Sequence, residues 1–380
     1  MKKQLLFLSL ASTLVSCTTI RQIKNQKIET RTNCSRFVAV NNKMIYHAKI
    51  DGVDQSFLFD TGSTISVLTD STATDMRQKE LGSLLSVKMA NNQKVKLQTM
   101  TASFDSELFH SDNKVFAYIN APKSKCSPDT SYKGILGMDA FFKNDNPLYL
   151  DFSNGKICNI SLLEKNELIT KGYTELKSEC KSKQIFVFVT MFGKEYKFKL
   201  DTGFVGAVIF PSSEYVQLSN YNTLAFEGSL FKTVSSNAYG ADVFIENIPV
   251  TIGSLTVNSN VIQSTSVGDD DNYLLGYSFM KGFDWIIDFN NNNVYVKRNS
   301  VELKNKLDAD IFKYAAAEKE QKLYVLVKQK KENDFQVGDQ IIAVKGETVT
   351  PENICRLQDL LNATRDWKSL NISVSPAKKE

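Results

Sequence analysis

An internal duplication constrains the fold of this chain of 380 residues more than any other feature of its sequence. The hexapeptide FLFDTG at residues 57–62 returns as FKLDTG at residues 198–203, which is 141 positions later. Two further landmarks return in the same order: ILG at 135–137 as LLG at 274–276, and LDF at 150–152 as IDF at 287–289. Solenoid repeats use much shorter units of about 20 to 50 residues, so the duplication indicates two homologous lobes.

Both lobes are predicted to consist of β-strands. Runs such as 185–191 and 243–252 are rich in β-branched and aromatic residues, and asparagine-rich segments provide turns between such runs. Short strands at regular spacing are typical of β-barrels and sandwiches. We therefore predict one lobe over residues 36–160 and a second over 184–299, joined by a charged linker, 161–183, that holds one helical turn.

The repeated aspartate is the motif that carries chemistry. Asp60 and Asp201 each follow an apolar strand and precede Thr-Gly, so that the strand fixes the carboxylate and the glycine permits a tight turn. A single Asp-Thr-Gly is more often a turn with a local side-chain hydrogen bond. Pseudo-twofold packing of duplicated lobes would instead bring the two copies face to face. The alternative is a pair of equivalent loops without chemistry.

With these motifs, residues 36–299 resemble the two-lobed aspartic proteases of the pepsin and retropepsin group, and the short lobes resemble the retropepsin side more closely. The resemblance implies a mainly β fold with two β-barrel lobes and a central cleft. It also implies that threonines of the two triplets bond across the lobes, and that the hydrophobic-hydrophobic-Gly segments thread beside the catalytic loops. The residues that it assigns are the catalytic Asp60 and Asp201, the supporting loop residues Thr61, Gly62, Ser63, Thr202 and Gly203, and the adjacent Gly137 and Gly276.

The chemistry of such a pair follows from electrostatics. Two carboxylates a few ångströms apart cannot both ionise comfortably, so they share one proton over a wide pH range. One takes a proton from a water that attacks the peptide carbonyl, while the protonated partner stabilises the carbonyl oxygen. This mechanism uses no cofactor, no metal and no covalent intermediate, and we expect none. It suits a chain whose only histidines are His47 and His110.

The second triplet departs from the family pattern. Ser63 follows the first triplet, and its hydroxyl is expected to bond the outer oxygen of Asp60, whereas the equivalent Phe204 has no hydroxyl. We therefore predict that Asp201, with one donor fewer, holds the shared proton and that the upper pKa of the pair lies above the usual pepsin range.

The resemblance also calls for a flap, a hairpin that closes over the substrate. The candidate in the first lobe is 87–95, with its turn at Asn91 and Asn92. In the second lobe it is 234–243, which is predicted to turn near Tyr239 and Gly240. A plain surface hairpin is the alternative for each.

The first residues have the pattern of an export signal. Two lysines precede a short apolar stretch, and the quartet LVSC at 14–17 resembles a bacterial lipobox. The resemblance implies that residues 1–16 are a signal peptide and that Cys17 is lipidated, with 17–35 as a polar tether. We expect membrane attachment by acyl chains and a place in the cell envelope, facing the periplasm or the cell surface. An ordinary signal peptide with an incidental cysteine is the alternative.

The C-terminal part resembles a second, smaller module. Residues 338–346 read GDQIIAVKG, which is similar to the Gly-Asp-x-Ile-x-x-Val-x-Gly core of PDZ domains. The resemblance implies a small α+β module over 323–376, with a helix at 351–361, that binds a peptide or the C-terminus of another protein along a strand edge. A partly helical linker is expected over 300–322. The alternative is a vestigial β-rich tail that packs on the lobes.

Five cysteines follow Cys17, and one or two disulfides among them are compatible with an oxidising compartment. The sequence leaves their pairing open, and no Cys/His spacing suggests a metal site. Cys355 is predicted to lie in the core of the tail module, on its helix. The five are Cys34, Cys126, Cys158, Cys180 and Cys355.

Charge adds one exclusion. Lys and Arg number 46 against 42 for Asp and Glu, which gives no support for a nucleic-acid partner. Together the patterns predict an envelope-tethered aspartic endopeptidase that acts on peptides or proteins. The alternative from a different class is a lipoprotein that keeps the bilobal fold as a non-catalytic peptide- or protein-binding module.

Overall fold

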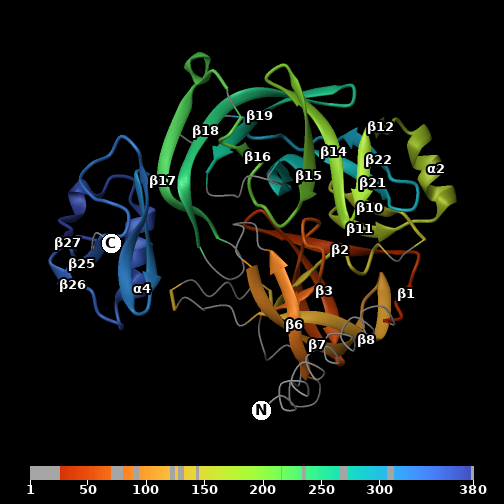
Figure 1. Ribbon diagram of the computed structural model, residues 1–380, viewed down its shortest axis with the longest axis horizontal. Helices are drawn as coiled ribbons and strands as arrows, with labels where there is room; N and C mark the ends of the chain where they lie inside the picture. The colour runs from red at the N-terminus through yellow and green to blue at the C-terminus, as the bar shows by residue number, and fades with distance from the viewer. Residues whose placement is uncertain are drawn as a thin grey trace, which may run out of the picture.

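The computed structural model describes residues 26–69, 80–88, 94–119, 125–126, 132–142, 145–214, 216–232, 237–265, 273–305 and 312–377, and over this part the protein is mainly β, as predicted (Figure 1). The signal peptide, Cys17, Asn91 and Asn92 lie outside the described residues. Among those that are described, no helix is both long enough and apolar enough to cross a membrane.

The elements fall into three consecutive groups. Those of the first half are β1 (Glu29–Thr30), β2 (Asn33–Val40), β3 (Lys43–Ile50), β4 (Val53–Phe59), β5 (Val67–Leu68), β6 (Glu80–Lys88), β7 (Lys94–Asp105), β8 (Phe109–Tyr118), β9 (Gly134–Leu136), β10 (Leu148–Asp151) and β11 (Lys156–Asn159). Those of the second half are α2 (Leu162–Thr170), β12 (Thr174–Leu176), β13 (Ser178–Lys181), β14 (Gln184–Met191), β15 (Lys194–Asp201), β16 (Val208–Pro211), η3 (Leu218–Asn220), β17 (Thr223–Lys232), β18 (Asn237–Ile252), β19 (Leu255–Ser264), β20 (Leu274–Gly276), α3 (Tyr277–Met280), β21 (Phe283–Asp288) and β22 (Asn293–Arg298). Those of the tail are β23 (Tyr314–Lys319), β24 (Lys322–Gln329), β25 (Gln340–Val344), β26 (Glu347–Thr348), α4 (Ile354–Ala363), η4 (Trp367–Leu370) and β27 (Ser373–Ser375).

The two halves share one pattern of strand pairing. In the first half, β4 runs parallel to β9, and β5 runs parallel to β8. In the second half, β15 runs parallel to β20, and β16 runs parallel to β19. The strand that leads into each Asp-Thr-Gly is therefore paired with the strand that leads into the matching glycine, Gly137 or Gly276.

A sheet shared by both halves marks a pseudo-twofold relation between them. Strands β2, β11 and β10 continue into β21, β22 and β12, and the central pair is β10 with β21. In that pair Tyr149 lies opposite Ile286, its own equivalent in the duplication. Leu148 and Leu150 lie opposite Ile287 and Trp285, so the register is symmetric about the central pair.

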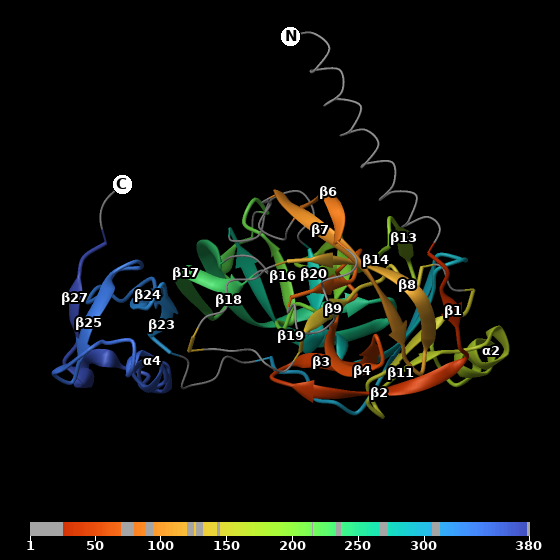
Figure 2. The ribbon, with the colours of Figure 1, turned by 90° about the horizontal axis from the view of Figure 1, so that it is seen from below.

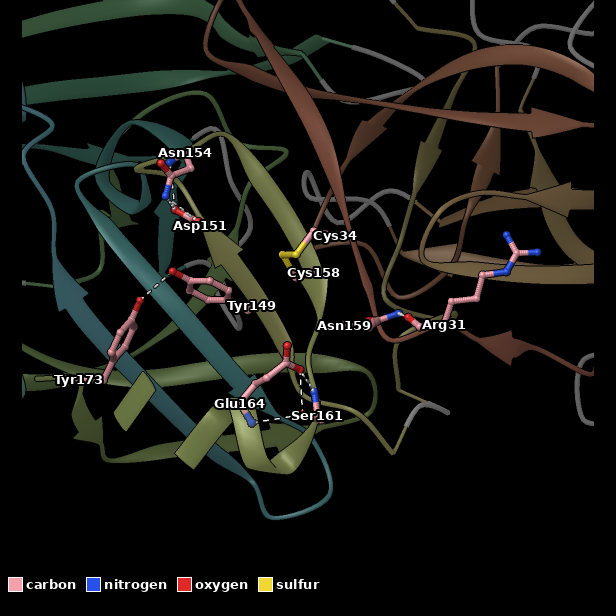
Figure 3. The surroundings of a disulfide bond; sticks show 10 residues. All are labelled: Arg31, Cys34, Tyr149, Asp151, Asn154, Cys158, Asn159, Ser161, Glu164 and Tyr173. Atoms are coloured by element: carbon pink, nitrogen blue, oxygen red, sulfur yellow. Dashed lines mark hydrogen bonds between the residues drawn. A yellow bond between two sulfur atoms is a disulfide. The ribbon is translucent and has the colours of Figure 1, made fainter. Parts of the chain in front are cut away.

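One disulfide joins two strands of this shared sheet. Cys34 on β2 is bonded to Cys158 on β11, which lies directly opposite in the register (Figure 3). Cys180 is the free cysteine of the described residues. This bond and a second one, described with the tail below, settle the pairing that the sequence leaves open.

The segment between the halves is more ordered than the predicted linker. Residues 162–170 form a helix of nine residues instead of one turn, because Ser161 and Glu164 build a capping box that bonds the first backbone N–H groups (Figure 3). The predicted tether is also shorter. The side chain of Gln26 accepts the backbone N–H of Val115 on β8, and β1 pairs with the same strand.

The tail lies beside β17 of the second half (Figures 1 and 2) and has a hydrophobic core of its own. Trp367 and Tyr314 stack at its centre, with 5.1 Å between their ring centroids. Strand β24 pairs with β17 of the second half, and Cys355 is bonded to Cys126 of the first. Cys355 lies on helix α4 and packs, half-buried, against the tail core, and its sulfur is engaged in this disulfide. In the segment 300–322, which is predicted to be partly helical, residues 314–319 form strand β23, the described residues 300–305 and 312–322 contain no helix, and 306–311 lie outside the described residues.

Candidate active site

The two repeated aspartates lie against each other at the ends of β4 and β15. A Cβ atom added to Gly62 would lie 2.3 Å from Cγ of Asp201, and one added to Gly203 would lie 2.5 Å from Cγ of Asp60. Each carboxyl group therefore packs on the glycine of the opposite triplet. Any side chain at either position would collide with the opposite carboxyl group, so the closeness of the pair requires both glycines.

Two buried threonines join the loops reciprocally. The backbone N–H of Thr61 donates to Oγ1 of Thr202 over 3.1 Å, and that of Thr202 donates to Oγ1 of Thr61 over 3.0 Å. Each hydroxyl then donates across the interface, from Thr61 to Leu200 O over 2.9 Å and from Thr202 to Phe59 O over 2.7 Å. Both threonines are fully buried, so these four bonds hold the loops in one relative position.

The donors around the two carboxyl groups differ between the halves. Oδ1 of Asp60 accepts the backbone N–H groups of Gly62 (2.8 Å) and Ser63 (3.2 Å). Oδ1 of Asp201 accepts the backbone N–H of Phe204 (3.0 Å). The hydroxyl of Ser63 donates to the carbonyl oxygen of Ile65 instead of to Asp60. The extra donor that the sequence suggests for Asp60 is thus a backbone amide, and the prediction for the hydroxyl is wrong.

A lysine stands beside the pair. Nζ of Lys199 lies 3.9 Å from Oδ2 of Asp201, and the side chains of these residues are 15% and 14% exposed. Burial, followed by the negative charge of Asp201, raises the pKa of Asp60 to about 8, against the opposing effect of Lys199. The ammonium group beside Asp201 and the raised pKa of Asp60 both favour a proton on Asp60, which differs from the sequence-based prediction for Asp201. The sequence analysis did not identify Lys199 as a site residue, although the duplication aligns it with Leu58.

The two landmark glycines lie beside the aspartate loops. A Cβ on Gly137 would lie 2.7 Å from Ile65 O, and one on Gly276 would lie 2.3 Å from Gly206 O. In each half the residue after the glycine donates its N–H to the residue that follows the triplet. Those bonds run from Met138 to Ser63 O and from Tyr277 to Phe204 O, both over 2.8 Å.

A buried ion pair, which the sequence analysis did not predict, lies beside the aspartate loop of the first half. Nζ of Lys114 lies 2.6 Å from Oδ2 of Asp139, and the lysine is fully buried. Asp139 also accepts the hydroxyl of Ser66 over 2.7 Å, and Ser66 accepts the N–H of Gly137 over 3.2 Å. Asp139 could have been identified from the sequence by its position two residues after Gly137, a glycine that is expected to lie beside the aspartate loop.

The two candidate flaps have different outcomes. Strands β6 and β7 pair as far as Lys88 opposite Lys94, which agrees with a hairpin over 87–95 whose tip lies outside the described residues. In the second half, Gly240 pairs with Gly228 inside the β17–β18 ladder, and Tyr239 belongs to the same strand. The turn predicted at those two residues is wrong, because the ladder continues to Lys232 opposite Asn237.

The histidines take no part in this site. Nδ1 of His47 contacts Ser56 on β4, and His110 lies on β8, where its ring contacts Asp105 and Asp112. Over the described stretches of the protein, no group of three or more His, Cys, Asp or Glu side chains could hold a metal ion. The charged side chains that the structure brings together at the site are the two carboxyl groups and the ammonium group of Lys199.

Comparison with known proteins identifies one family. Residues 46–140 match the family model described as aspartyl protease, a range that includes the first triplet and Gly137. No curated protein matches the sequence. This match supports an aspartyl protease domain in the first half.

Proposed function

We propose that this protein is an aspartic endopeptidase in which Asp60 and Asp201 together activate one water molecule. The observation that carries the proposal is that each carboxyl group lies against the glycine of the other triplet. The aspartyl protease match over residues 46–140 supports the same reaction class. The pseudo-twofold register of β10 and β21 supports two lobes of the pepsin and retropepsin type, with β-barrel character, and a substrate that lies across the pair between them.

The proposed reaction starts with the proton on Asp60 and the negative charge on Asp201. Asp201 takes a proton from the water as its oxygen bonds to the peptide carbonyl carbon, and Asp60 gives its proton to the carbonyl oxygen. Asp201 then passes its proton to the peptide nitrogen while the C–N bond breaks. Asp60 recovers a proton from one hydroxyl of the tetrahedral intermediate as the new carboxyl group forms, which restores the starting state.

We propose that the tail is a PDZ-like module that supports the second half through the pairing of β24 with β17. We also propose that the strand edge at which such a module would bind a peptide is occupied by its own side chains. The outer edge of β23 is bonded to α4. The N–H of Ala316 donates to Oδ1 of Asn362 over 2.8 Å, and Nδ2 of Asn362 donates back to Ala316 O over 3.0 Å. The N–H of Glu318 donates to Oε1 of Gln358 over 2.6 Å. An added peptide strand would have to displace these side chains.

The place of action rests on the sequence alone. We propose that Cys17 carries the acyl anchor, that residues 1–16 are removed, and that the enzyme works in the cell envelope on peptide or protein substrates. Gln26 is hydrogen-bonded to Val115 on β8, so in this proposal the tether between the anchor and the enzyme consists of residues 17–25.

The test is cleavage of a denatured protein and a peptide library by the protein from residue 18 onward, over a wide pH range. We expect cleavage by the wild type and none by Asp60→Asn or Asp201→Asn. Asp54→Asn is the matched control, because Asp54 is exposed on the same strand as the first triplet. Equal cleavage by all variants would assign the activity elsewhere. An inactive wild type would favour the non-catalytic binding lipoprotein.

A further inference from the structure

We propose that Lys199 is a positioning residue that holds the negative charge of the aspartate pair on Asp201 and thereby sets the pH range of the reaction. The inference rests on the proposed function. It also makes a claim about the charge distribution of the pair that can be measured without any substrate.

The duplication shows what Lys199 replaces. In the first half the equivalent residue is Leu58, which lies between Ile45 and Ile135 in the sheet and is 5% exposed. Lys199 occupies the same register position, between Phe186 and Leu274. A strand position that is apolar in one half thus carries an ammonium group in the other, on the strand that leads into the aspartate.

The surroundings make this charge effective. Nζ of Lys199 lies 3.9 Å from Oδ2 of Asp201, and both side chains are largely shielded from solvent, with 15% and 14% exposed. The neighbour of Lys199 on β20, Leu274, packs in an apolar cluster with Ile209 and Ile262. Charges in such surroundings are screened much less by water and salt than charges on the surface.

The other charged groups near this strand are engaged elsewhere. Lys197, two residues earlier on β15, pairs with Glu179 on β13 over 2.5 Å. Glu214 accepts the hydroxyl of Tyr273, which precedes β20, over 2.5 Å. Among the described residues, the acids that act on the ammonium group of Lys199 are the two of the site, Asp201 at 3.9 Å and Asp60 across the interface.

This arrangement breaks the symmetry of the pair. A lysine ammonium is positively charged at acid and neutral pH, so it favours a carboxylate at the nearer acid and leaves the proton on the farther one. Asp201 becomes the acceptor of the proton from water, and Asp60 becomes the donor to the carbonyl oxygen. A cation beside the pair also makes each ionisation easier, so both limbs of the pH profile lie lower than they would without it.

The test compares variants of the protein from residue 18 onward. Lys199→Met removes the charge at similar volume, Lys199→Leu copies the first half, and Lys199→Arg keeps the charge. Lys197→Met is the matched control, since that lysine lies on the same strand but is paired with Glu179. Profiles of kcat/KM against pH are measured together with the carboxyl titration of ¹³C-labelled aspartate by NMR, with Asp60→Asn and Asp201→Asn used for assignment.

We expect Lys199→Met and Lys199→Leu to move both limbs of the profile upward by about 1 to 3 pH units, the range for a charge within about 4 to 6 Å. Lys199→Arg and Lys197→Met should stay close to wild type. Unchanged carboxyl titration in the two apolar variants would overturn the inference, even in an active enzyme. An inactive wild type whose carboxyl titration still moves would leave the inference standing and reject the proposed function. Should one apolar variant not fold, the other and the arginine variant decide the outcome.

Discussion

Thr61 and Thr202 each accept the backbone N–H of the other through their hydroxyl groups, and both are fully buried. Replacement of Thr202 by valine keeps the volume but leaves the N–H of Thr61 and the carbonyl oxygen of Phe59 unpaired. Because an unsatisfied buried group costs about 1 to 3 kcal/mol, we expect a loss of roughly 2 to 5 kcal/mol in the free energy of unfolding. Urea denaturation followed by circular dichroism measures it.

Thr202→Ser is the control, because serine keeps the hydroxyl and loses one methyl group. Its expected loss is about 1 kcal/mol. Equal losses for serine and valine would contradict the role assigned to the hydroxyl.

Activity is expected to extend to neutral pH. The reaction needs one proton on the pair, and burial together with the charge of Asp201 raises the pKa of Asp60 to about 8. That proton is retained below this value and lost above it, so kcat/KM should fall as pH rises through about 8. A profile of kcat/KM confined to strongly acid pH would contradict the assignment.

The same pKa predicts how stability depends on pH. The pKa of Asp60 is raised from 3.8 in the unfolded state to about 8 in the folded one. The folded state therefore binds the proton of Asp60 more tightly, and the contribution of Asp60 to stability is greatest below about pH 4 and falls as pH rises toward 8. Asp60→Asn removes this dependence, so the variant should gain on the order of 2 to 4 kcal/mol relative to wild type between pH 4 and pH 8.

Chemical denaturation at a series of pH values measures this difference. Asp54→Asn, at an exposed position on the same strand, should give a difference that does not change over the same range. A constant difference for Asp60→Asn as well would show that Asp60 titrates normally in the folded protein.

The sequence was enough to predict the β class and the closeness of the two aspartates, because a repeated motif is a local signal that also reports the symmetry of the fold. The sequence was not enough to predict which of Asp60 and Asp201 holds the negative charge. That depends on where the side chain of Lys199 reaches and on which group the hydroxyl of Ser63 bonds, and neither follows from spacing. Disulfide pairing also depends on strand register, which brings Cys34 opposite Cys158.

The closed edge of β23 predicts that the tail binds no added peptide. In Asn362→Ala, the buried Ala316 loses the partners of its N–H and carbonyl groups, which should cost roughly 1 to 2 kcal/mol of tail stability. Asp359→Ala, on the exposed side of the same helix, should cost little. Fluorescence anisotropy with a labelled library of peptide C-termini measures binding, and saturable binding to the wild-type tail would contradict the occupied strand edge that we propose.

The buried pair of Lys114 and Asp139 should matter far more than an exposed one. Lys114→Met leaves the carboxylate of Asp139 buried without its cation, and breaking such a pair costs about 3 to 5 kcal/mol. The exposed pair of Arg356 and Glu347 is the control, and Arg356→Met should cost less than about 1 kcal/mol. Urea denaturation measures both losses.

Because Asp139 is linked through Ser66 to the loop beside Asp60, Lys114→Met should also lower kcat. Adding Asp139→Asn to Lys114→Met removes the stranded charge and should recover part of the lost stability. If it recovers none, the loss comes from packing around Lys114 rather than from the uncompensated carboxylate.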